Sequence, residues 1–499
     1  MAEKEIKESG ALDNTSNSDR DLVVAEGSVA QTQKSRWERS WPVIACGSGL
    51  FSDGFCQAII GPVNTMLKIL YKDEYTGSSA QQNVASIAFA GTVLGQLVFG
   101  YSSDHWSRRH SLLISTIILI VFAALGAGSY GAGGSVQGLF AALTAYRFLL
   151  GIGIGGEYPA GSVACAESTG ELKKGHRNRW FIFFTNFMID SGFVVASLAA
   201  MIVVLATTEK HLRAAWRICL GLAVIPPLSL IYLRIKLKEP ESYSRAKMTN
   251  YPWWLIIKFY GFRLSVVSLI WFIYDFSSYS FSIYSSSWLA FLLPSDAPLW
   301  KSFGWSTVIN SFYIPGSFLG AFVSDYIGPK YALALGVVLQ GAIGFLMSGI
   351  YGHLDQASHV GGFVVVYGIF LSLGELGPGD NIGLVASKTS ATSIRGQYYG
   401  IAAALGKVGA FVGTYVFPDI IAAAGDDVIK QGQYPFFVSS ALCIFSGIIT
   451  LLFIPYIGQD TIDHEDQRFK EYLKQHGYDI ESLGTQEFKE RRRSIQAGA

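Results

Sequence analysis

The chain has 499 residues, of which 50% are hydrophobic and 15% charged, whereas soluble domains carry about 25% charged residues. Its mean hydropathy is +0.34, which excludes a disordered chain and makes an ordinary soluble enzyme improbable. A formal net charge of +1 offers no basic footprint for nucleic acid. The composition therefore indicates a membrane protein.

Twelve apolar runs follow one another along the chain. A membrane-spanning helix needs about 20 apolar residues, and runs that are continuous rather than alternating favour helices over barrel strands. The sequence thus predicts an all-α membrane protein with twelve transmembrane helices. The runs are 42–70, 83–103, 111–130, 137–161, 180–206, 214–233, 263–292, 303–324, 331–352, 360–388, 396–423 and 434–457.

Basic residues predict the orientation of these helices. Lys and Arg gather between the second and third runs, between the fourth and fifth, and in the 234–263 connector. Short loops rich in Lys and Arg stay in the cytoplasm, so both termini are predicted to be cytoplasmic. The predicted parts are a cytoplasmic tail 1–40, a six-helix bundle 41–236, a linker 237–261, a second bundle 262–457 and a solvated cytoplasmic tail 458–499.

Intramembrane polar residues recur at a nearly constant offset between the two halves. A repeat with a binding site between its halves is a known transporter plan. The pairs are Asp53 and Asp275 (222 residues apart), Asp104 and Asp325 (221), Glu157 and Asp380 (223), and Asn186 and Lys407 (221).

Three segments carry marks of a known superfamily. Residues 100–109 have the sequence GYSSDHWSRR, residues 147–155 have RFLLGIGIG, and residues 240–242 have PES. They resemble the GxxxDxxGRR loop, the RxxxGxGxG helix and the PES turn of the major facilitator superfamily, whose fold is two six-helix bundles. The resemblance assigns conformational gating to Asp104, Arg108, Arg109, Arg147 and Asp325, with Arg147 bracing the glycine-rich helix.

A charge at the bilayer centre costs about 2.5–3.5 kcal/mol, so each intramembrane charge needs an explanation. It is either functional, part of a structural ion pair, or a helix-end residue. In the seventh run, Trp271, Asp275 and Tyr279 share one helix face. Lys407 between two glycines is a natural ligand for a phosphate. The remaining intramembrane charges considered are Asp53, Glu157, Asp380, Glu375, Asp190 and Arg147, whereas Lys388 and Asp419 are interpreted as helix-end residues.

The same residues resemble the phosphate:proton symporter family. Its GGDYP segment appears as GGEYP at 155–159, its W-x3-D-x3-Y as Trp271, Asp275 and Tyr279, and its RGxxxGxxxxxGKxGA as residues 395–410. The resemblance implies a substrate-binding Lys407, a helix-five amide at Asn186, and proton-linked carboxyl groups.

Two departures point to a branch of that family. A second Asp of the first run is replaced by Cys56, and the GPN of the tenth run becomes Gly377-Pro378-Gly379. These spellings resemble the fungal glycerophosphoinositol permeases. The resemblance implies import of glycerophosphoinositol or glycerophosphocholine across the plasma membrane, with Asp380 and Asn381 near the head group.

Charge arithmetic favours coupling to protons. The four carboxylates Asp53, Glu157, Asp275 and Asp380 and the two cations Arg147 and Lys407 leave a net charge of −2, and burial disfavours ionised carboxyl groups. An anion therefore enters most simply together with protons. Proton coupling is assigned to Asp53, Glu157 and Asp275. Substrate binding is assigned to Lys407, Tyr158, Asn186, Trp271, Asp275, Tyr279, Asp380 and Asn381.

The predicted function is thus a proton-coupled importer of glycerophosphodiesters. The alternatives are an inorganic phosphate:proton symporter and a nutrient receptor that does not transport. The expected partners are the anion, protons and membrane lipid, without nucleic acid, and the chain is expected to be monomeric. All five cysteines lie in apolar runs without metal-like spacing, so neither a metal nor a cofactor is predicted.

Overall fold

A computed structural model describes residues 36–490 except 77, 171, 174, 293–296, 355–359 and 487. The chain divides into two units, Met1–Trp41 and Pro42–Ala499. Most of the predicted tail 1–40 and the end of the chain at 491–499 lie outside the described residues. The following description concerns the second unit, together with helix α2, which begins at Arg36.

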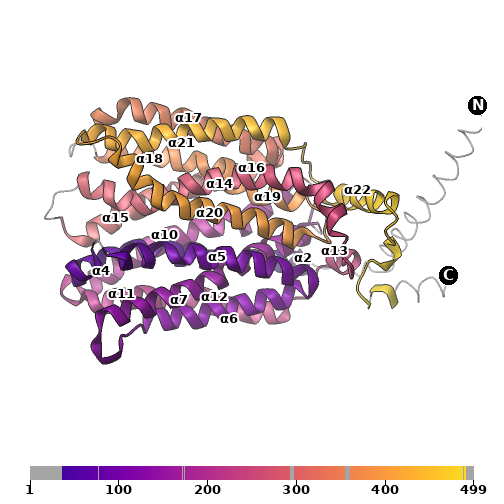
Figure 1. The fold of residues 1–499 in the computed structure, drawn as a ribbon, viewed down its shortest axis with the longest axis horizontal. Helices are drawn as coiled ribbons and strands as arrows, with labels where there is room; N and C mark the ends of the chain where they lie inside the picture. Colours follow the sequence, from indigo (N-terminus) through magenta and orange to yellow (C-terminus); the bar gives the residue numbers. More distant parts are fainter. Residues whose placement is uncertain are drawn as a thin grey trace, which may run out of the picture. The chain divides into compact units, whose positions relative to one another are not determined.

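The first half of the chain is helical (Figure 1). The first predicted span corresponds to α2 (Arg36–Gly47), α3 (Leu50–Ala58) and α4 (Ile60–Tyr75). The second corresponds to α5 (Ser79–His105). The next spans are α6 (Arg108–Ala127), α7 (Val136–Gly156) with η2 (Glu157–Ser162) and α8 (Val163–Thr169), α9 (Arg177–Phe184) with α10 (Asn186–Thr207), and α11 (Leu212–Leu222) with α12 (Ile225–Lys236).

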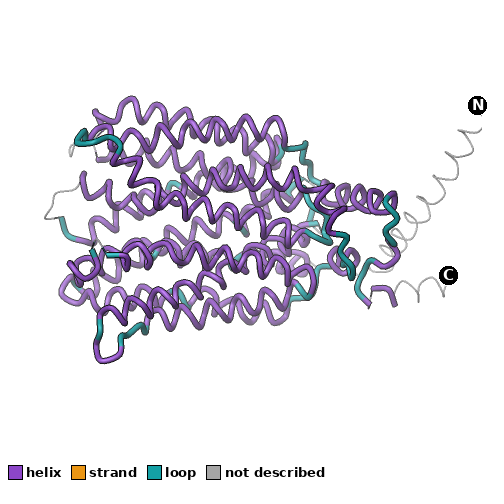
Figure 2. Tube along the Cα trace, viewed as in Figure 1, coloured by secondary structure: helices purple, strands orange, loops and turns teal. Residues whose placement is uncertain are grey.

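The second half repeats this plan after the short linker helix α13 (Glu241–Ala246). Its helices are α14 (Trp253–Leu292), α15 (Leu299–Ser311), α16 (Tyr313–Ile327), α17 (Pro329–Leu354), α18 (Val360–Gly374), η5 (Glu375–Gly379), α19 (Asp380–Lys388), α20 (Arg395–Ala422), α21 (Val428–Phe453) and α22 (Thr461–Gln475). Helices and loops account for the described residues, without a strand (Figure 2).

Eleven helical stretches among the described residues are long and apolar enough to cross a membrane, one fewer than the twelve predicted runs. The run that does not qualify is 303–324. It is divided at Phe312 into α15 and α16, and its Ser, Thr, Asn and Trp residues make it more polar than its neighbours.

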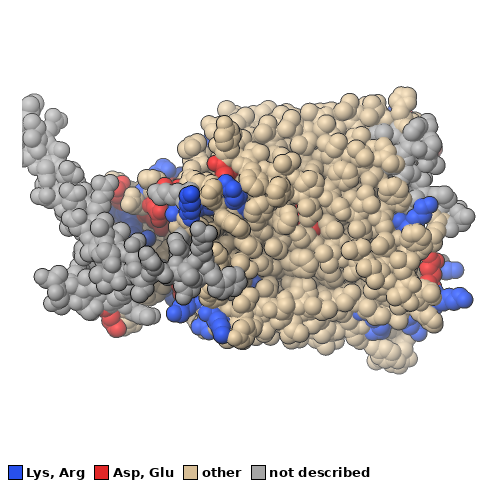
Figure 3. Space-filling view, turned by 180° about the vertical axis from the view of Figure 1, so that it is seen from behind, with Lys and Arg blue, Asp and Glu red and all other residues tan. Residues whose placement is uncertain are grey.

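The outer surface of these helices is apolar. Large side chains such as Leu97, Ile202 and Leu228 are about half exposed. Figure 3 shows a wide band that is almost free of charge between two ends where Lys, Arg, Asp and Glu gather. A lipid bilayer tolerates such a band, because helices satisfy their backbone hydrogen bonds internally.

Glycines allow the central helices to approach closely. Helix α5 packs along α7, and α14 packs along α20. A Cβ atom on Gly155 would lie 2.4 Å from the Thr92 carbonyl oxygen, and one on Gly400 would lie 2.5 Å from the Gln96 oxygen. The second contact joins α20 to α5, so small residues also set the distance between the two halves.

Two spans are interrupted by π-helical turns at equivalent places in the halves. The turns η2 and η5 contain Pro159 and Pro378, and proline lacks the N–H that a regular helix needs. Such turns occur frequently at functional sites. They bring Tyr158 and Gly379 to the interior cavity described below.

The segment after the last span packs against the helical body, unlike the predicted solvated tail. Asp466 of α22 accepts hydrogen bonds from the Thr392 backbone N (2.6 Å) and hydroxyl (2.7 Å). The Phe469 ring lies 5.2 Å from the Tyr260 ring. The apolar stripe of α22 was too short to stand out from its many charged residues in the sequence.

The glycine contacts generate a stability prediction. Gly155→Ala places a methyl group against the α5 backbone and should lower stability by about 1–3 kcal/mol, as overpacking does. Gly126→Ala is the matched control, because a Cβ there meets no atom within 4 Å. The measurement is the thermal unfolding midpoint of the purified protein in detergent. Equal midpoints for the two variants would contradict the close packing of α5 and α7.

Candidate functional site

A cavity lies between the two halves of the second unit. Helix α10 and turn η2 line it from the first half, and α14, η5, α19 and α20 line it from the second. Seven of the eight predicted substrate-binding residues border it, and Asn381 does not. The seven are Tyr158, Asn186, Trp271, Asp275, Tyr279, Asp380 and Lys407.

One side of the cavity, here called the cationic pole, is built around Lys407. Its Nζ atom lies 3.1 Å from Asp275 Oδ2 and donates to the Tyr279 hydroxyl at 2.5 Å. The ammonium also lies over the rings of Tyr279 (3.9 Å) and Tyr158 (5.2 Å). Lys407 is 1% exposed, so this buried cation is held by one carboxylate and two aromatic faces.

Asp53 is connected to the cationic pole by a single hydrogen bond, which Tyr158 donates. The Tyr158 hydroxyl donates to Asp53 Oδ2 at 2.5 Å, and the Gln57 amide donates to Oδ1. Asp53 is fully buried and does not border the cavity itself. Tyr158 therefore links the Asp53 carboxyl group to the Lys407 surroundings.

The opposite side, here called the acidic pole, consists of Asp190, Glu375 and Asp380 around Asn186. The Asn186 amide nitrogen lies 2.9 Å from Glu375 Oε2, 3.0 Å from Asp380 Oδ1 and 3.4 Å from Asp190 Oδ2. The Tyr274 hydroxyl donates to Glu375 Oε1 at 2.8 Å. Three carboxyl groups thus share one amide.

Gly379 replaces the Asn of the family's GPN motif, and the space of the missing side chain is filled from within the protein. A Cβ on Gly379 would lie 1.9 Å from Glu375 Oε2 and 2.9 Å from the Tyr274 hydroxyl. Asn381 points elsewhere, because its amide donates to the Gly377 carbonyl at 2.8 Å and its oxygen accepts from Ser324 at 2.5 Å. The missing side chain is therefore replaced by a carboxyl group.

Glu157 lies outside the cavity. Its two oxygens each accept from Arg234 at 2.6 Å, and Ser115 donates to it at 2.9 Å. Both members of this pair are buried. The position of Glu157 indicates a structural ion pair and gives no support to the predicted proton-carrying role.

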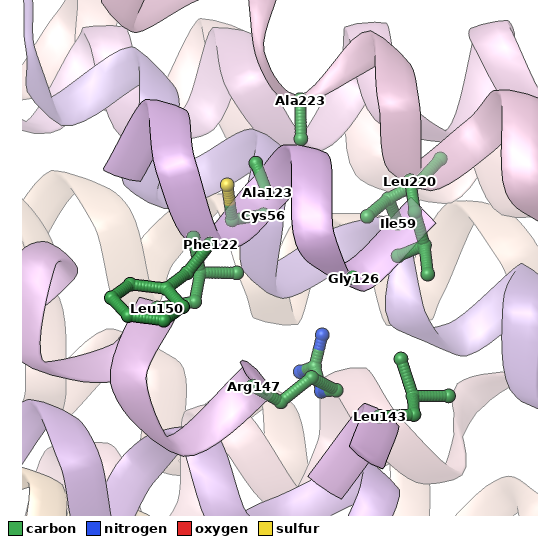
Figure 4. Close-up of a pocket in the computed structure, with 10 residues that line it drawn as sticks. All are labelled: Cys56, Ile59, Phe122, Ala123, Gly126, Leu143, Arg147, Leu150, Leu220 and Ala223. Atoms are coloured by element: carbon green, nitrogen blue, oxygen red, sulfur yellow. The ribbon is translucent and has the colours of Figure 1, made fainter. Parts of the chain in front are cut away.

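Arg147 lies in a separate, apolar pocket of the first half (Figure 4). Its Nε donates to the Val84 carbonyl at 2.7 Å, which ties α7 to α5 as the bracing role predicts. Its Nη1 has no hydrogen-bond partner. The guanidinium points into a space bordered by Cys56, Leu143 and Leu150. Cys56, the predicted replacement of an Asp, therefore borders the Arg147 pocket and not the cavity between the halves.

Two predicted gating residues join the two halves in the same way. Asp104 accepts from the backbone N of Gly396 (2.9 Å) and Gln397 (2.7 Å), at the start of α20. Asp325 accepts from the backbone N of Asn178 (3.2 Å) and Arg179 (3.4 Å), at the start of α9. Each carboxylate therefore caps a helix of the opposite half, where the helix dipole favours negative charge.

The two basic gating residues differ in position. Arg108 contacts Asp104 (2.6 Å) and Glu167 (2.9 Å) and donates to the Thr392 carbonyl of the other half (3.1 Å). Arg109 donates to the Ile235 carbonyl at 2.5 Å. Arg108 therefore belongs to the contact between the halves, whereas Arg109 fixes the end of α12.

The sequence assignment did not include several residues of these networks, among them Asp190, Glu375, Gln57 and Arg234. Asp190 and Glu375 are intramembrane carboxyl groups and so carried a signal. Gln57 follows Asp53 by one helical turn. Arg234 lay among connector residues that were interpreted as cytoplasmic, although it is 1% exposed. The burial of Arg234 could not be predicted from the sequence, because the end of a helix and a short loop have the same composition.

A helical body with apolar outer faces, charges inside and a central cavity between repeated halves defines a membrane transporter. A family model of sugar (and other) transporters matches residues 41–250 and 240–469. The chain belongs to this family, and it is a multi-pass membrane protein. This agrees with the prediction of a transporter rather than an enzyme.

Three proteins illustrate the similarity. The major glycerophosphoinositol permease GIT3 of Candida albicans is 54% identical over 89% of this chain and 84% of its own length. The glycerophosphocholine permease GIT4 of the same organism is 53% identical with the same coverage. The structure of the proton:xylose symporter XylE covers 87% of this chain and 99% of its own, with a TM-score of 0.71 and 16% identity. The fold is therefore that of the major facilitator superfamily, as predicted.

The Glu157–Arg234 pair generates a second prediction. Arg234→Ala leaves a buried carboxylate without its cation and should lower stability by about 3–5 kcal/mol. Replacing both partners by Met should restore part of the loss, because no unpaired charge remains. Arg468→Ala is the control, because that side chain is 61% exposed. An Arg234→Ala midpoint equal to that of the wild type, measured by thermal unfolding in detergent, would contradict the structural role.

Proposed function

We propose that this protein is a proton-coupled permease that imports glycerophosphodiesters, such as glycerophosphoinositol and glycerophosphocholine. The single observation that supports this most is Lys407 at the wall of the cavity between the halves, where it is the one cation among the lining residues that the structure describes. The similarity to permeases of both diesters supports the same substrate class.

The substrate phosphate takes the place of the Asp275 carboxylate at Lys407. The ammonium has three donors, of which Asp275 and Tyr279 engage two. Trp271 and Tyr158 border the same pole and orient the glycerol part of the substrate. A monoanionic diester matches the single charge of the lysine.

Protons neutralise the carboxyl groups that the anion would otherwise meet. Asp275 takes up a proton when the phosphate displaces it from Lys407, and Asp53 takes up a second through the Tyr158 hydroxyl. Each proton contributes about 2.3 kcal/mol per 100 mV of membrane potential, so the proton gradient can concentrate the substrate.

Access alternates by rocking of the two halves about the cavity. The Asp104 and Asp325 caps hold the cytoplasmic ends together in the conformation described, and their release opens the cavity to the cytoplasm. The basic loops at that end support cytoplasmic termini, and import of an external nutrient supports a plasma-membrane location. The cavity lies within one chain, which supports a monomer as the working unit.

Inorganic phosphate is the alternative substrate, and the presence of the acidic pole disfavours it. A phosphate ion carries no head group that could occupy the side of the cavity facing Asp190, Glu375 and Asp380. A receptor that does not transport its ligand would bind the same molecule, so an experiment must distinguish it from a transporter. Exchange of labelled substrate across a liposome membrane requires a transporter.

The test is uptake of labelled glycerophosphoinositol by proteoliposomes containing the full chain. Lys407→Ala should lower uptake by at least about 30-fold, the loss expected when one partner of a buried charge pair is removed. Lys430→Ala is the control, because that side chain is 52% exposed. Faster uptake of phosphate than of the diester, or unchanged uptake by Lys407→Ala, would overturn the proposal.

A further inference from the structure

The acidic pole contains more acceptors than the surrounding donors can satisfy. The carboxyl groups of Asp190, Glu375 and Asp380 present six oxygen atoms. The donors around them are the two amide hydrogens of Asn186, the Tyr274 hydroxyl and the Ser317 hydroxyl. Within the part of the chain that the structure describes, Asp190 Oδ1 and Asp380 Oδ2 have no hydrogen-bond partner.

No cation compensates these carboxyl groups among the described residues that border the pole. Asp190 and Asp380 are each 1% exposed, and Glu375 is 4% exposed. Three ionised carboxylates around one amide would repel one another strongly in so dry a place. The pole must therefore hold hydrogen atoms or a positive charge that the protein itself does not supply.

The titratable neighbours of the pole come from three packed helices. Helix α14 contributes Tyr274 and Asp275, α16 contributes Tyr313, and α20 contributes Lys407. Lys407 is engaged by Asp275 and Tyr279 at the cationic pole. The adjacent residues Tyr274 and Asp275 thus face opposite poles of one cavity, so a bound molecule that reaches both contacts Lys407 at one end and carboxyl groups at the other.

We infer that the acidic pole is a head-group site that binds either a proton or the cation of the substrate head group. This inference rests on the proposed function and extends it to selectivity. A neutral polyol head group leaves the pole protonated and exchanges hydrogen bonds with it. A quaternary ammonium head group displaces one proton and takes its place, beside the Tyr274 and Phe193 rings that line the cavity.

This exchange determines how many protons, and how much net charge, cross the membrane with each substrate molecule. Glycerophosphoinositol carries one negative charge, and glycerophosphocholine is a zwitterion with no net charge. If the ammonium replaces a proton, the choline diester moves one proton fewer than the inositol diester. The total charge of the loaded cavity is then the same for both, so the net charge moved per molecule is equal.

The experiment measures protons and charge per substrate in proteoliposomes that contain the wild-type chain. Labelled diester uptake is recorded together with internal pH, and net charge comes from the reversal potential at set gradients. The proton ratio should be larger for glycerophosphoinositol by about one, because one cation replaces one proton, with equal charge per molecule. Equal proton ratios, with a charge per molecule that differs by one, would overturn the inference. Uptake of neither diester would overturn the proposed function as well.

A matched pair of variants tests the residues. Glu375→Gln and Asp380→Asn remove the carboxylates that face the head group. They should lower the kcat/KM ratio of glycerophosphocholine to glycerophosphoinositol by at least about tenfold, since a buried cation loses its partner. Asp427→Asn, a change at a half-exposed N-cap of α21, should leave the ratio unchanged. An unaltered ratio in both variants would place the head group elsewhere.

Discussion

The imbalance between one ammonium and four carboxyl groups at the cavity wall is the constraint on which the site depends. The residues Lys407, Asp275, Asp190, Glu375 and Asp380 all line the cavity, and Lys407 pairs with Asp275. A membrane interior can hold these groups only if they are paired or protonated. The lysine is satisfied by Asp275 and two tyrosine rings, so the remaining charge must be balanced by protons or by what binds. The proposed coupling between substrate and protons rests on this imbalance.

The repeated architecture places the two poles at equivalent points. Asn186 and Lys407, 221 residues apart, each lie at the centre of a pole. An amide in one half and an ammonium in the other give the cavity its polarity. The equivalent pair Asp104 and Asp325 keeps a single role, since each caps a helix of the opposite half. The repeat is thus preserved at the contact between the halves and differs at the cavity, where one half supplies an amide and the other an ammonium.

Much of this could be predicted from the sequence. Continuous apolar runs and basic loops determine the all-helical membrane fold, because spanning helices need length and hydrophobicity above all. Lys407, Asp275 and Tyr279 could be joined in advance because a helical face and a family motif agree. The break at Phe312 and the packing of α22 could not, because both depend on tertiary contacts that leave weak local patterns.

The roles of the acidic residues were harder to predict, since composition cannot tell a structural pair from a free carboxyl group. Glu157 and Asp380 are matched by the repeat, yet Glu157 has Arg234 as partner, whereas Asp380 forms no ion pair with any residue that the structure describes. The difference lies in Arg234, a residue of another helix with no place in the motif.

Cys56 and Gly379 are the two positions at which the sequence departs from the phosphate-symporter motifs, and each lies near a charged group of its own half. Cys56 borders the apolar pocket that holds the Arg147 guanidinium. The space above Gly379 holds the Glu375 carboxyl group, at the cavity between the halves. Three of the four carboxyl groups that line this cavity, Asp275, Glu375 and Asp380, belong to the second half. The titratable groups of the cavity are therefore concentrated in that half, and Gly379 is the departure that bears on the cavity wall, because Cys56 lies outside it.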